Sequence, residues 1–278
     1  MSSSEDLSRL SLNQATIPGW SVAEAAEGCA RAGVGWLGLW RNRVAEAGLG
    51  PSVLALRDAG VRVSSLCRGG WFLVAEQGAP ADRRADNLRA VEEAAALGAE
   101  TLVLVCGPAP DRDLGSARRR IAEAIAELAA PAAQSGVRLA IEPMHPMYCG
   151  DRSVVVTLAQ ARAMAEAAGP QVGVAVDTYH VWWDPEVEAE VEATGPRILG
   201  FHLADWLVPT PHMLNGRGLM GDGVIDFRRL SGAVGRAGYR GPVEVEIFNP
   251  GIWALPGPDA LRLVCERYLT QVLAPSGP

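Results

Sequence analysis

The sequence predicts an α/β protein built as one (βα)8 barrel, the TIM barrel fold, and three observations support this prediction. Short apolar runs of strand length alternate along the chain with alanine-rich segments of helical spacing. Eight such units fit into the 278 residues without a linker between them. The competing fold, an open doubly wound sheet, predicts a GxGxxG turn after its first strand, and the segment IPGWSVAEA has none. We therefore expect one domain over residues 1–278, with frayed ends near 1–6 and 274–278.

The expected elements follow from apolar periodicity and from capping residues. The apolar runs predict strands near Leu10–Ile17, Trp36–Trp40, Val61–Cys67, Thr101–Cys106, Val137–Ile141, Val172–Val176, Ile198–Leu203 and Val243–Phe248. Helical spacing is clearest after Leu114, where Ile121, Ile125 and Leu128 share one face. Ser21 followed by Glu24 predicts a capping box at the start of a helix. Glycines are expected at or near helix ends at Gly33, Gly60, Gly98, Gly136, Gly169 and Gly238.

Composition excludes several classes of function. The formal net charge of −7 disfavours a nucleic-acid partner or an anionic membrane surface. From the polar start we expect no signal peptide, and no apolar run approaches the ~20 residues of a membrane span. The five cysteines are scattered and form no CxxC motif, so we expect reduced thiols in the cytoplasm. The chain has no lysine, which excludes Schiff-base aldolases, pyridoxal enzymes and Walker-type ATPases.

Acidic and imidazole side chains stand at the carboxyl ends of the last four expected strands. The fifth strand ends at Glu142, the sixth at Asp177 and the seventh at His202, and the eighth carries Glu246. Glu244 faces the same side of the eighth strand but lies farther from its end, which favours Glu246. Because barrel active sites lie at this end, we expect the four side chains to converge. Such an oxygen-rich set predicts one divalent metal, Mn²⁺ first, with Mg²⁺ or Co²⁺ as alternatives.

Each of these residues has an ordinary structural explanation when it is taken singly. A strand-end aspartate usually caps the next helix, and a lone histidine is more often packed than ligating. The set is more informative than its members, because all four histidines lie between residues 145 and 212 and three follow strands.

Large aromatic and basic residues also follow the expected strands. Six tryptophans do so, namely Trp40, Trp71, Trp182, Trp183, Trp206 and Trp253. Indole faces stack on sugars and on flat aglycones, so we expect Trp40, Trp71 and Trp182 to contact substrate, while about half of the six plug the rim. Arg68 is a further candidate for substrate binding. For Arg41 and Arg68, binding of a phosphate or carboxylate and a salt bridge within the rim are equal alternatives. Arg152 is expected in a surface ion pair, with contact to a substrate hydroxyl as the alternative.

The segment from Trp206 to Gly223 is long for a barrel connection, and we expect it to form a cover or a partner surface. Asp205 precedes it, where the aspartate either orients His202 or caps a turn. His212 lies in a proline-rich part of this segment and is expected to be solvated. Asp226 is expected to cap the following helix.

The ordered motifs IEP, VDTYH, FHLADW, R…GDGVIDF and EVEIF resemble the xylose isomerase-like family of sugar isomerases and epimerases. The resemblance covers most of the chain. It implies that Glu142, Asp177, His202 and Glu246 bind one divalent metal and that the two glutamates move protons at the sugar carbons. It further implies that His180 contacts substrate and that Arg217 touches substrate oxygens. Endonuclease IV-like members carry extra histidines after the earlier strands, where this chain has Cys67, Arg68 and Cys106.

A narrower resemblance concerns the segments GLWR, SLCRGGWF and EPMHPMYCGDRSVV, which are similar to the catalytic subunit of bacterial C-glycoside deglycosidases. This resemblance implies a 3-keto glycoside substrate, a small β-sheet partner subunit and His145 as the proton-abstracting base.

The expected function is a metal-dependent sugar isomerase or epimerase that abstracts a proton beside a carbonyl and forms an enediolate. If a leaving group stands at the β carbon, the same enolate expels it, and the enzyme is a lyase. The non-enzyme alternative is a metal-free barrel that serves as a binding or assembly subunit. We expect a sugar or glycoside ligand and a homo-oligomer, or a hetero-oligomer in the deglycosidase case.

Overall fold

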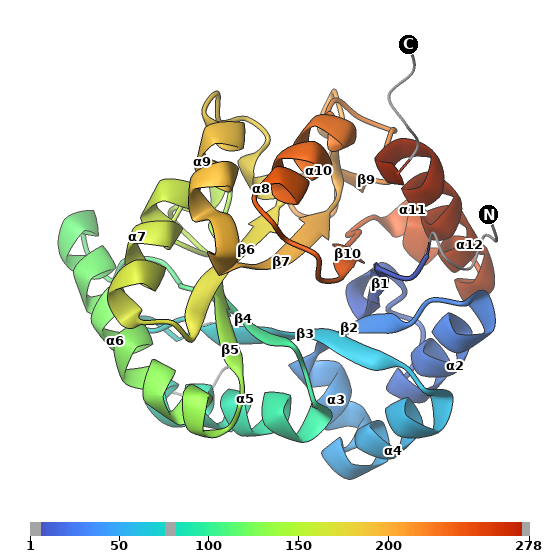
Figure 1. Ribbon diagram of the computed structural model, residues 1–278, viewed down its shortest axis with the longest axis horizontal. Helices are drawn as coiled ribbons and strands as arrows, with labels where there is room; N and C mark the ends of the chain where they lie inside the picture. Colours follow the sequence, from blue (N-terminus) through green and yellow to red (C-terminus); the bar gives the residue numbers. More distant parts are fainter. Residues whose placement is uncertain (1–6, 76–81, 274–278) are drawn as a thin grey trace.

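The computed structural model of the protein describes residues 7–75 and 82–273. Its strands form a closed barrel in the order β1-β10-β7-β6-β5-β4-β3-β2, with parallel pairing throughout. Figure 1 shows helices arranged around these strands. The prediction of a single (βα)8 barrel is confirmed. The frayed ends expected near residues 1–6 and 274–278 lie outside the described residues.

The strands lie where the apolar runs predict them. The barrel strands are β1 (Leu10–Asn13), β2 (Trp36–Trp40), β3 (Arg62–Gly70), β4 (Thr101–Val105), β5 (Arg138–Ile141), β6 (Val172–Asp177), β7 (Ile198–Leu203) and β10 (Val243–Val245). The first and last strands are shorter than expected. Strand β1 ends because Asn13 caps the 3-10 turn Gln14–Thr16, accepting from Ala15 N at 2.9 Å, and β10 ends beside the side chain of Thr16. Its hydroxyl donates to Val245 O at 3.0 Å and accepts from Ile247 N at 2.9 Å, so it replaces ladder bonds at this seam of the barrel.

The helices surround the barrel, most of them on its outside and the short one that directly follows β6 at its carboxyl end. They are α2 (Val22–Ala32), α3 (Arg41–Ala47), α4 (Leu49–Ala59), α5 (Arg83–Leu97), α6 (Leu114–Gln134), α7 (Leu158–Ala168), α8 (Thr178–Val181), α9 (Val187–Thr194), α10 (Phe227–Arg236), α11 (Pro250–Trp253) and α12 (Gly257–Arg267). Short 3-10 turns occupy Gln14–Thr16, Pro146–Tyr148 and Gly195–Arg197, and a π-helical turn occupies Tyr268–Leu273.

Local sequence signals explain the helix boundaries. Ser21 and Glu24 form the predicted capping box at the start of α2. Asp226 caps α10, as predicted, by accepting from Arg229 N at 3.0 Å. The predicted apolar face of α6 is fully buried at Ile121 and Ile125. These contacts fix the outer layer that supports the strands.

A polar layer lies inside the barrel, on the strands just before the site. The Glu244 carboxylate accepts from Asn13 Nδ2 at 2.6 Å, from Ser64 Oγ at 2.6 Å and from Ser65 Oγ at 2.9 and 3.0 Å. Gly38 makes room for it, since a Cβ there would lie 2.2 Å from Glu244 Oε1. Glu244 is therefore held inside the barrel, which agrees with the choice of Glu246 as the residue nearer the mouth.

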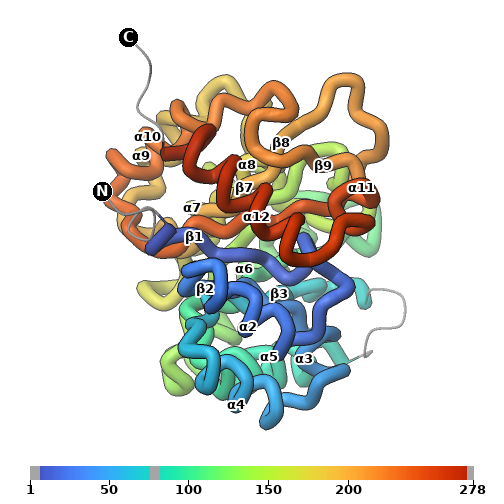
Figure 2. Tube along the Cα trace, turned by 90° about the vertical axis from the view of Figure 1, so that its right-hand side faces the viewer, coloured from blue at the N-terminus to red at the C-terminus, as the bar shows by residue number. Residues whose placement is uncertain are grey.

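The long connection after β7 forms a small hairpin. Strand β8 (Asp205–Trp206) pairs antiparallel with β9 (Arg217–Gly218). Figure 2 shows this hairpin at the same end of the molecule as α8. Among the described residues, no helix is both long and apolar enough to cross a membrane.

Candidate active site

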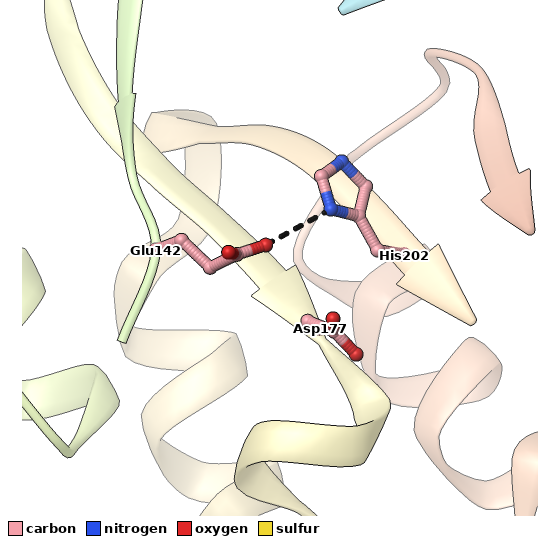
Figure 3. A group of neighbouring side chains, drawn as sticks. All are labelled: Glu142, Asp177 and His202. Carbon is pink, nitrogen blue, oxygen red and sulfur yellow. Dashed lines mark hydrogen bonds and ion pairs between the residues drawn. The ribbon is translucent and has the colours of Figure 1, made fainter. Parts of the chain in front are cut away.

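Three side chains meet at the carboxyl ends of β5, β6 and β7. Glu142 directly follows β5, Asp177 ends β6 and His202 lies on β7, opposite Asp177 in the register of the two strands. One ligand atom from each residue lies within 4.8 Å of the other two. Figure 3 shows Glu142 and His202 pointing toward each other, with His202 Nδ1 at 3.1 Å from Glu142 Oε1, and Asp177 beside them. The structure thus brings together three of the four predicted metal ligands.

The electrostatics of this cluster suit a cation. All three side chains are buried. Burial raises the pKa of Asp177 to about 6, although Arg217 opposes the shift. Burial lowers the pKa of His202, but the charges of Glu244 and Glu142 prevail and raise it to about 10. Two buried carboxylates and one imidazole with converging ligand atoms fit a divalent ion, because a cation offsets the cost of their charge.

Glu246 lies beside this cluster in an ion pair. Its Oε2 accepts from Arg217 Nη1 at 2.8 Å, and the same nitrogen lies 3.5 Å from Asp177 Oδ2. Burial raises the pKa of Glu246 to about 7, against the opposing charge of Arg217. The guanidinium is fixed between the rings of Tyr179 and Phe248, each 4.7 Å away. The assignment of Glu246 as the fourth ligand stays a prediction.

Two histidines each accept a main-chain hydrogen bond through Nδ1. His180 Nδ1 accepts from the main-chain N–H of His145 at 3.2 Å, and His145 Nδ1 accepts from Met147 N at 3.2 Å. In each neutral ring the proton is therefore assigned to Nε2. His180 Nε2 is buried without a hydrogen-bond partner and lies 3.7 Å from Asp177 Oδ2. Burial lowers the pKa of both histidines, so both are neutral donors near pH 7.

The aromatic side chains form two groups. Trp206 stacks on His145 at 4.8 Å and packs against Tyr179 at 4.8 Å and Trp182 at 5.5 Å. Trp183 meets the edge of His145 at 5.8 Å. These rings surround the histidines, as expected of residues at the mouth of the barrel.

The second group lies at the seam between the first and last strands. Trp40 donates to Asn13 Oδ1 at 2.9 Å and Trp253 to Ala15 O at 2.9 Å, and both contact the ring of Phe248. Trp253 thus fits the prediction that some tryptophans plug the rim.

The basic residues directly after β2 and within β3 have different surroundings. Arg41 pairs with Asp86 and Glu93, so it forms the rim salt bridge that was the alternative to anion binding. The guanidinium carbon of Arg68 lies 5.3 Å from the centre of the Trp71 ring, and Trp71 directly follows β3. The substrate-binding roles of Arg68 and Trp71 stay predictions.

Asp205 organises the hairpin rather than His202. It accepts from four main-chain N–H groups, those of Trp206, Gly221, Gly223 and Ile225, at 2.7 to 3.0 Å. Of the two roles left open for this residue, the turn cap is the one that the hydrogen bonds support.

Two tyrosines hold the tip of the hairpin. Tyr148 and Tyr179 both donate to Met213 O, at 2.6 and 2.7 Å. No sequence pattern predicts this contact, because the acceptor is a main-chain oxygen far along the chain. His212 is exposed, as predicted, and accepts from Leu214 N and Asn215 N.

Known proteins share the fold of this chain. A family model described as a xylose isomerase-like TIM barrel matches residues 40–268. A solved protein from Sinorhizobium meliloti 1021 is 43% identical with a TM-score of 0.91, covering 96% of this chain and 99% of that one. The IOLI protein, solved with a zinc atom, has a TM-score of 0.82 at 19% identity, covering 95% and 98% of the two chains.

One curated protein adds an activity to the comparison. A ketose 3-epimerase from Arthrobacter globiformis is 28% identical over 143 residues, which are 51% of this chain and 44% of the epimerase. The match thus spans less than half the length of that relative.

Proposed function

Because the chain belongs to the xylose isomerase-like TIM barrel family, we propose that it is a divalent-metal-dependent isomerase or epimerase of a keto-sugar or sugar derivative. The observation that carries the proposal is the convergence of Glu142, Asp177 and His202 at the carboxyl ends of three adjacent strands. The similarity to a ketose 3-epimerase supports the class of reaction.

Glu142, Asp177 and His202 would hold the ion, and Glu246 is proposed as its fourth ligand. When bound, the ion supplies Lewis-acid stabilisation of negative charge on substrate oxygens. We propose Mn²⁺ first, with Mg²⁺ or Co²⁺ as alternatives, because three carboxylates and one imidazole form an oxygen-rich set. The zinc atom of the IOLI protein makes zinc a further metal to be tested.

The residues of the chain would move the proton. Glu246 has a pKa near 7, so at neutral pH it can both accept a proton from the carbon beside the carbonyl and return it. Glu142 is proposed as the second proton carrier, on the opposite side of the reacting carbon. Removal and return on opposite faces give epimerisation, and return to the adjacent carbon gives isomerisation. Each outcome passes through an enediolate of the substrate.

The remaining residues would position the substrate. His180 directs a buried Nε2–H toward the space beside Asp177, where it can donate to a substrate oxygen. Arg217 holds Glu246 in place and faces substrate oxygens. Trp40, Trp71, Trp182 and Arg68 complete the proposed binding surface.

Solvent deuterium incorporation tests the proposal. The purified protein, loaded separately with Mn²⁺, Mg²⁺, Co²⁺ or Zn²⁺, is incubated with a panel of ketoses in D₂O and the carbon next to the ketone is observed by NMR. We expect exchange with metal, loss of exchange in EDTA, and a decrease of about 10²–10⁴-fold in Glu246→Gln. Glu266→Gln, on the outer helix α12, is the matched control. Metal-independent exchange, or no exchange with any ketose, contradicts the proposal.

Metal binding is tested separately by elemental analysis. We expect close to one bound ion per chain in the wild type and none in the double variant Glu142→Gln, Asp177→Asn. Unchanged occupancy in the double variant contradicts the ligand assignment.

C-glycoside cleavage is a second candidate, because His145 lies directly beside His180. Its Nδ1 already accepts a hydrogen bond from Met147, so the free nitrogen carries the proton and fits a donor better than a base. Incubation with a 3-keto C-glycoside tests this candidate. Release of aglycone that His145→Ala abolishes favours it, and equal release by the variant excludes His145 as the base. The retained carboxylates argue against a metal-free binding subunit.

Location and assembly also remain proposals. The five cysteines are free thiols, which supports a reducing compartment such as the cytoplasm. We propose a homo-oligomer, or a complex with a small β-sheet subunit in the deglycosidase case, and light scattering of the purified chain tests this.

A further inference from the structure

Arg152 lies one aromatic ring away from the buried histidine of the site. Its guanidinium carbon is 5.7 Å from the centre of the Tyr148 ring, and the same ring meets His180 edge-on at 5.8 Å. The charge of Arg152 acts on both His180 and Tyr148. The guanidinium therefore belongs to the surroundings of the site.

The main chain around Arg152 is fixed to the barrel. Arg152 N donates to Tyr148 O at 2.9 Å. The next residue, Ser153, forms a parallel bridge with Gly107, and Val154 N donates to Gly107 O at 3.1 Å. The side chain of Arg152 is therefore attached to a rigid segment, and a rigid backbone favours precise binding of a ligand.

The surroundings of Arg152 leave its charge available. Its ion pair with Asp151 is long, at 3.8 Å, and the side chain of Asp151 is 66% exposed. Such an exposed pair contributes little. The Nε atom of Arg152 is buried and has no hydrogen-bond partner. The surface ion pair expected from the sequence exists, but it does not satisfy the buried nitrogen.

Other unpartnered groups around the site are also donors. Arg217 Nε, His180 Nε2 and Trp182 Nε1 are buried without hydrogen-bond partners. A site that offers N–H groups on this side complements a ligand rich in acceptors, and a guanidinium prefers an oxyanion over a hydroxyl.

We propose that Arg152 binds an oxyanion group of the substrate, so that the substrate is an acidic keto-sugar with a carboxylate or phosphate remote from its carbonyl. The inference rests on the proposed function for the reacting end of the molecule. Arg152 is then a residue that determines specificity, and it leaves the chemical step to the carboxylates.

Binding of unreactive polyols tests the inference without turnover. Calorimetry compares D-glucitol, D-gluconate and D-glucitol 6-phosphate on the metal-loaded protein at one ionic strength, because exposed charges are screened by salt. We expect one or both acids to bind about tenfold or more tightly than D-glucitol, since hydrogen bonds to charged groups are strong. The two acids distinguish a carboxylate site from a phosphate site.

Variants assign the preference to Arg152. Arg152→Gln should remove the preference for the acid and leave D-glucitol binding unchanged, and Arg152→Lys should keep part of it. Arg120→Gln, which removes an exposed arginine of α6, is the matched control for net charge. Equal binding of acid and D-glucitol by the wild type, no binding of any of the three, or an acid preference that survives in Arg152→Gln overturns the inference.

Turnover separates this inference from the proposed function. With D-fructose and D-fructose 6-phosphate or a keto-sugar acid in D₂O, Arg152→Gln should raise KM for the acidic substrate and leave kcat unchanged. Exchange on neutral ketoses without an acid preference refutes the role of Arg152 alone. An Arg152-dependent acid preference without any exchange refutes the proposed function alone.

Discussion

Replacement of Asp205 by asparagine should loosen the β8–β9 hairpin. Asp205 is fully buried, and its two carboxylate oxygens accept from four main-chain N–H groups. Oδ2 alone accepts from Gly221 and Gly223. An asparagine can keep one of the two oxygens, but its NH₂ group must then face the other pair of N–H donors.

The expected cost follows from this count. A hydrogen bond to a charged acceptor contributes about 1.5–3 kcal/mol to the free energy of unfolding, so the loss of two should lower it by about 3–6 kcal/mol. For a chain of this size, that corresponds to a decrease of about 6–12 °C in Tm. If the hairpin opens locally instead, the loss appears as faster amide exchange with a smaller change in Tm.

Thermal denaturation by circular dichroism and hydrogen exchange of peptides from 206–225 measure the two outcomes. Asp226→Asn is the matched control, because asparagine caps a helix about as well as aspartate and its Tm should hardly change. If Asp205→Asn keeps both the Tm and the exchange rates of the wild type, the four hydrogen bonds do not hold the hairpin.

Three further predictions concern the site and its support. In EDTA, Glu246→Gln should become more stable relative to the wild type as the pH rises from 5 to 8. The pKa of Glu246 is raised in the folded state, so the folding stability of the wild type decreases as this carboxyl ionises. A pH-independent difference in Tm between the two proteins contradicts this prediction. Arg217→Lys should lower kcat/KM about tenfold to a hundredfold in the exchange assay. An ammonium cannot fill the space between the rings of Tyr179 and Phe248 or keep the geometry of the guanidinium. Full activity of this variant would refute the proposed role of Arg217 in positioning Glu246 and the substrate. Gly70→Ala should lower Tm strongly, since φ is 105° and the new Cβ would lie 2.0 Å from Val105 O, whereas Gly235→Ala in α10 meets no neighbour and serves as the control.

The sequence predicted the barrel and most of the cluster because both follow from local patterns. Apolar runs identify each strand, and the residue that ends a parallel strand must lie at one rim of a barrel. Asp177 and His202 could thus be assigned to neighbouring positions before their register was known. The capping box of Ser21 and the cap of Asp226 are equally local.

Contacts between distant segments could not be predicted in this way. Glu246 pairs with Arg217, which lies 29 residues earlier on a hairpin that has no strand-like pattern. The last strand ends early because Thr16, from the other end of the chain, bonds to its backbone. Arg152 Nε lacks a hydrogen-bond partner because of how its turn packs against Tyr148, and no pattern in the sequence predicts that packing.

The shared acceptor of the two tyrosines has a consequence for how the protein could diversify. Both hydroxyls end on the carbonyl oxygen of Met213, whose two lone pairs are then occupied. Since every residue type has a main-chain oxygen, the exposed side chain of Met213 is not needed for these two hydrogen bonds. Substitutions at position 213 can therefore change the exposed surface of the hairpin while the two hydrogen bonds from the tyrosines are kept.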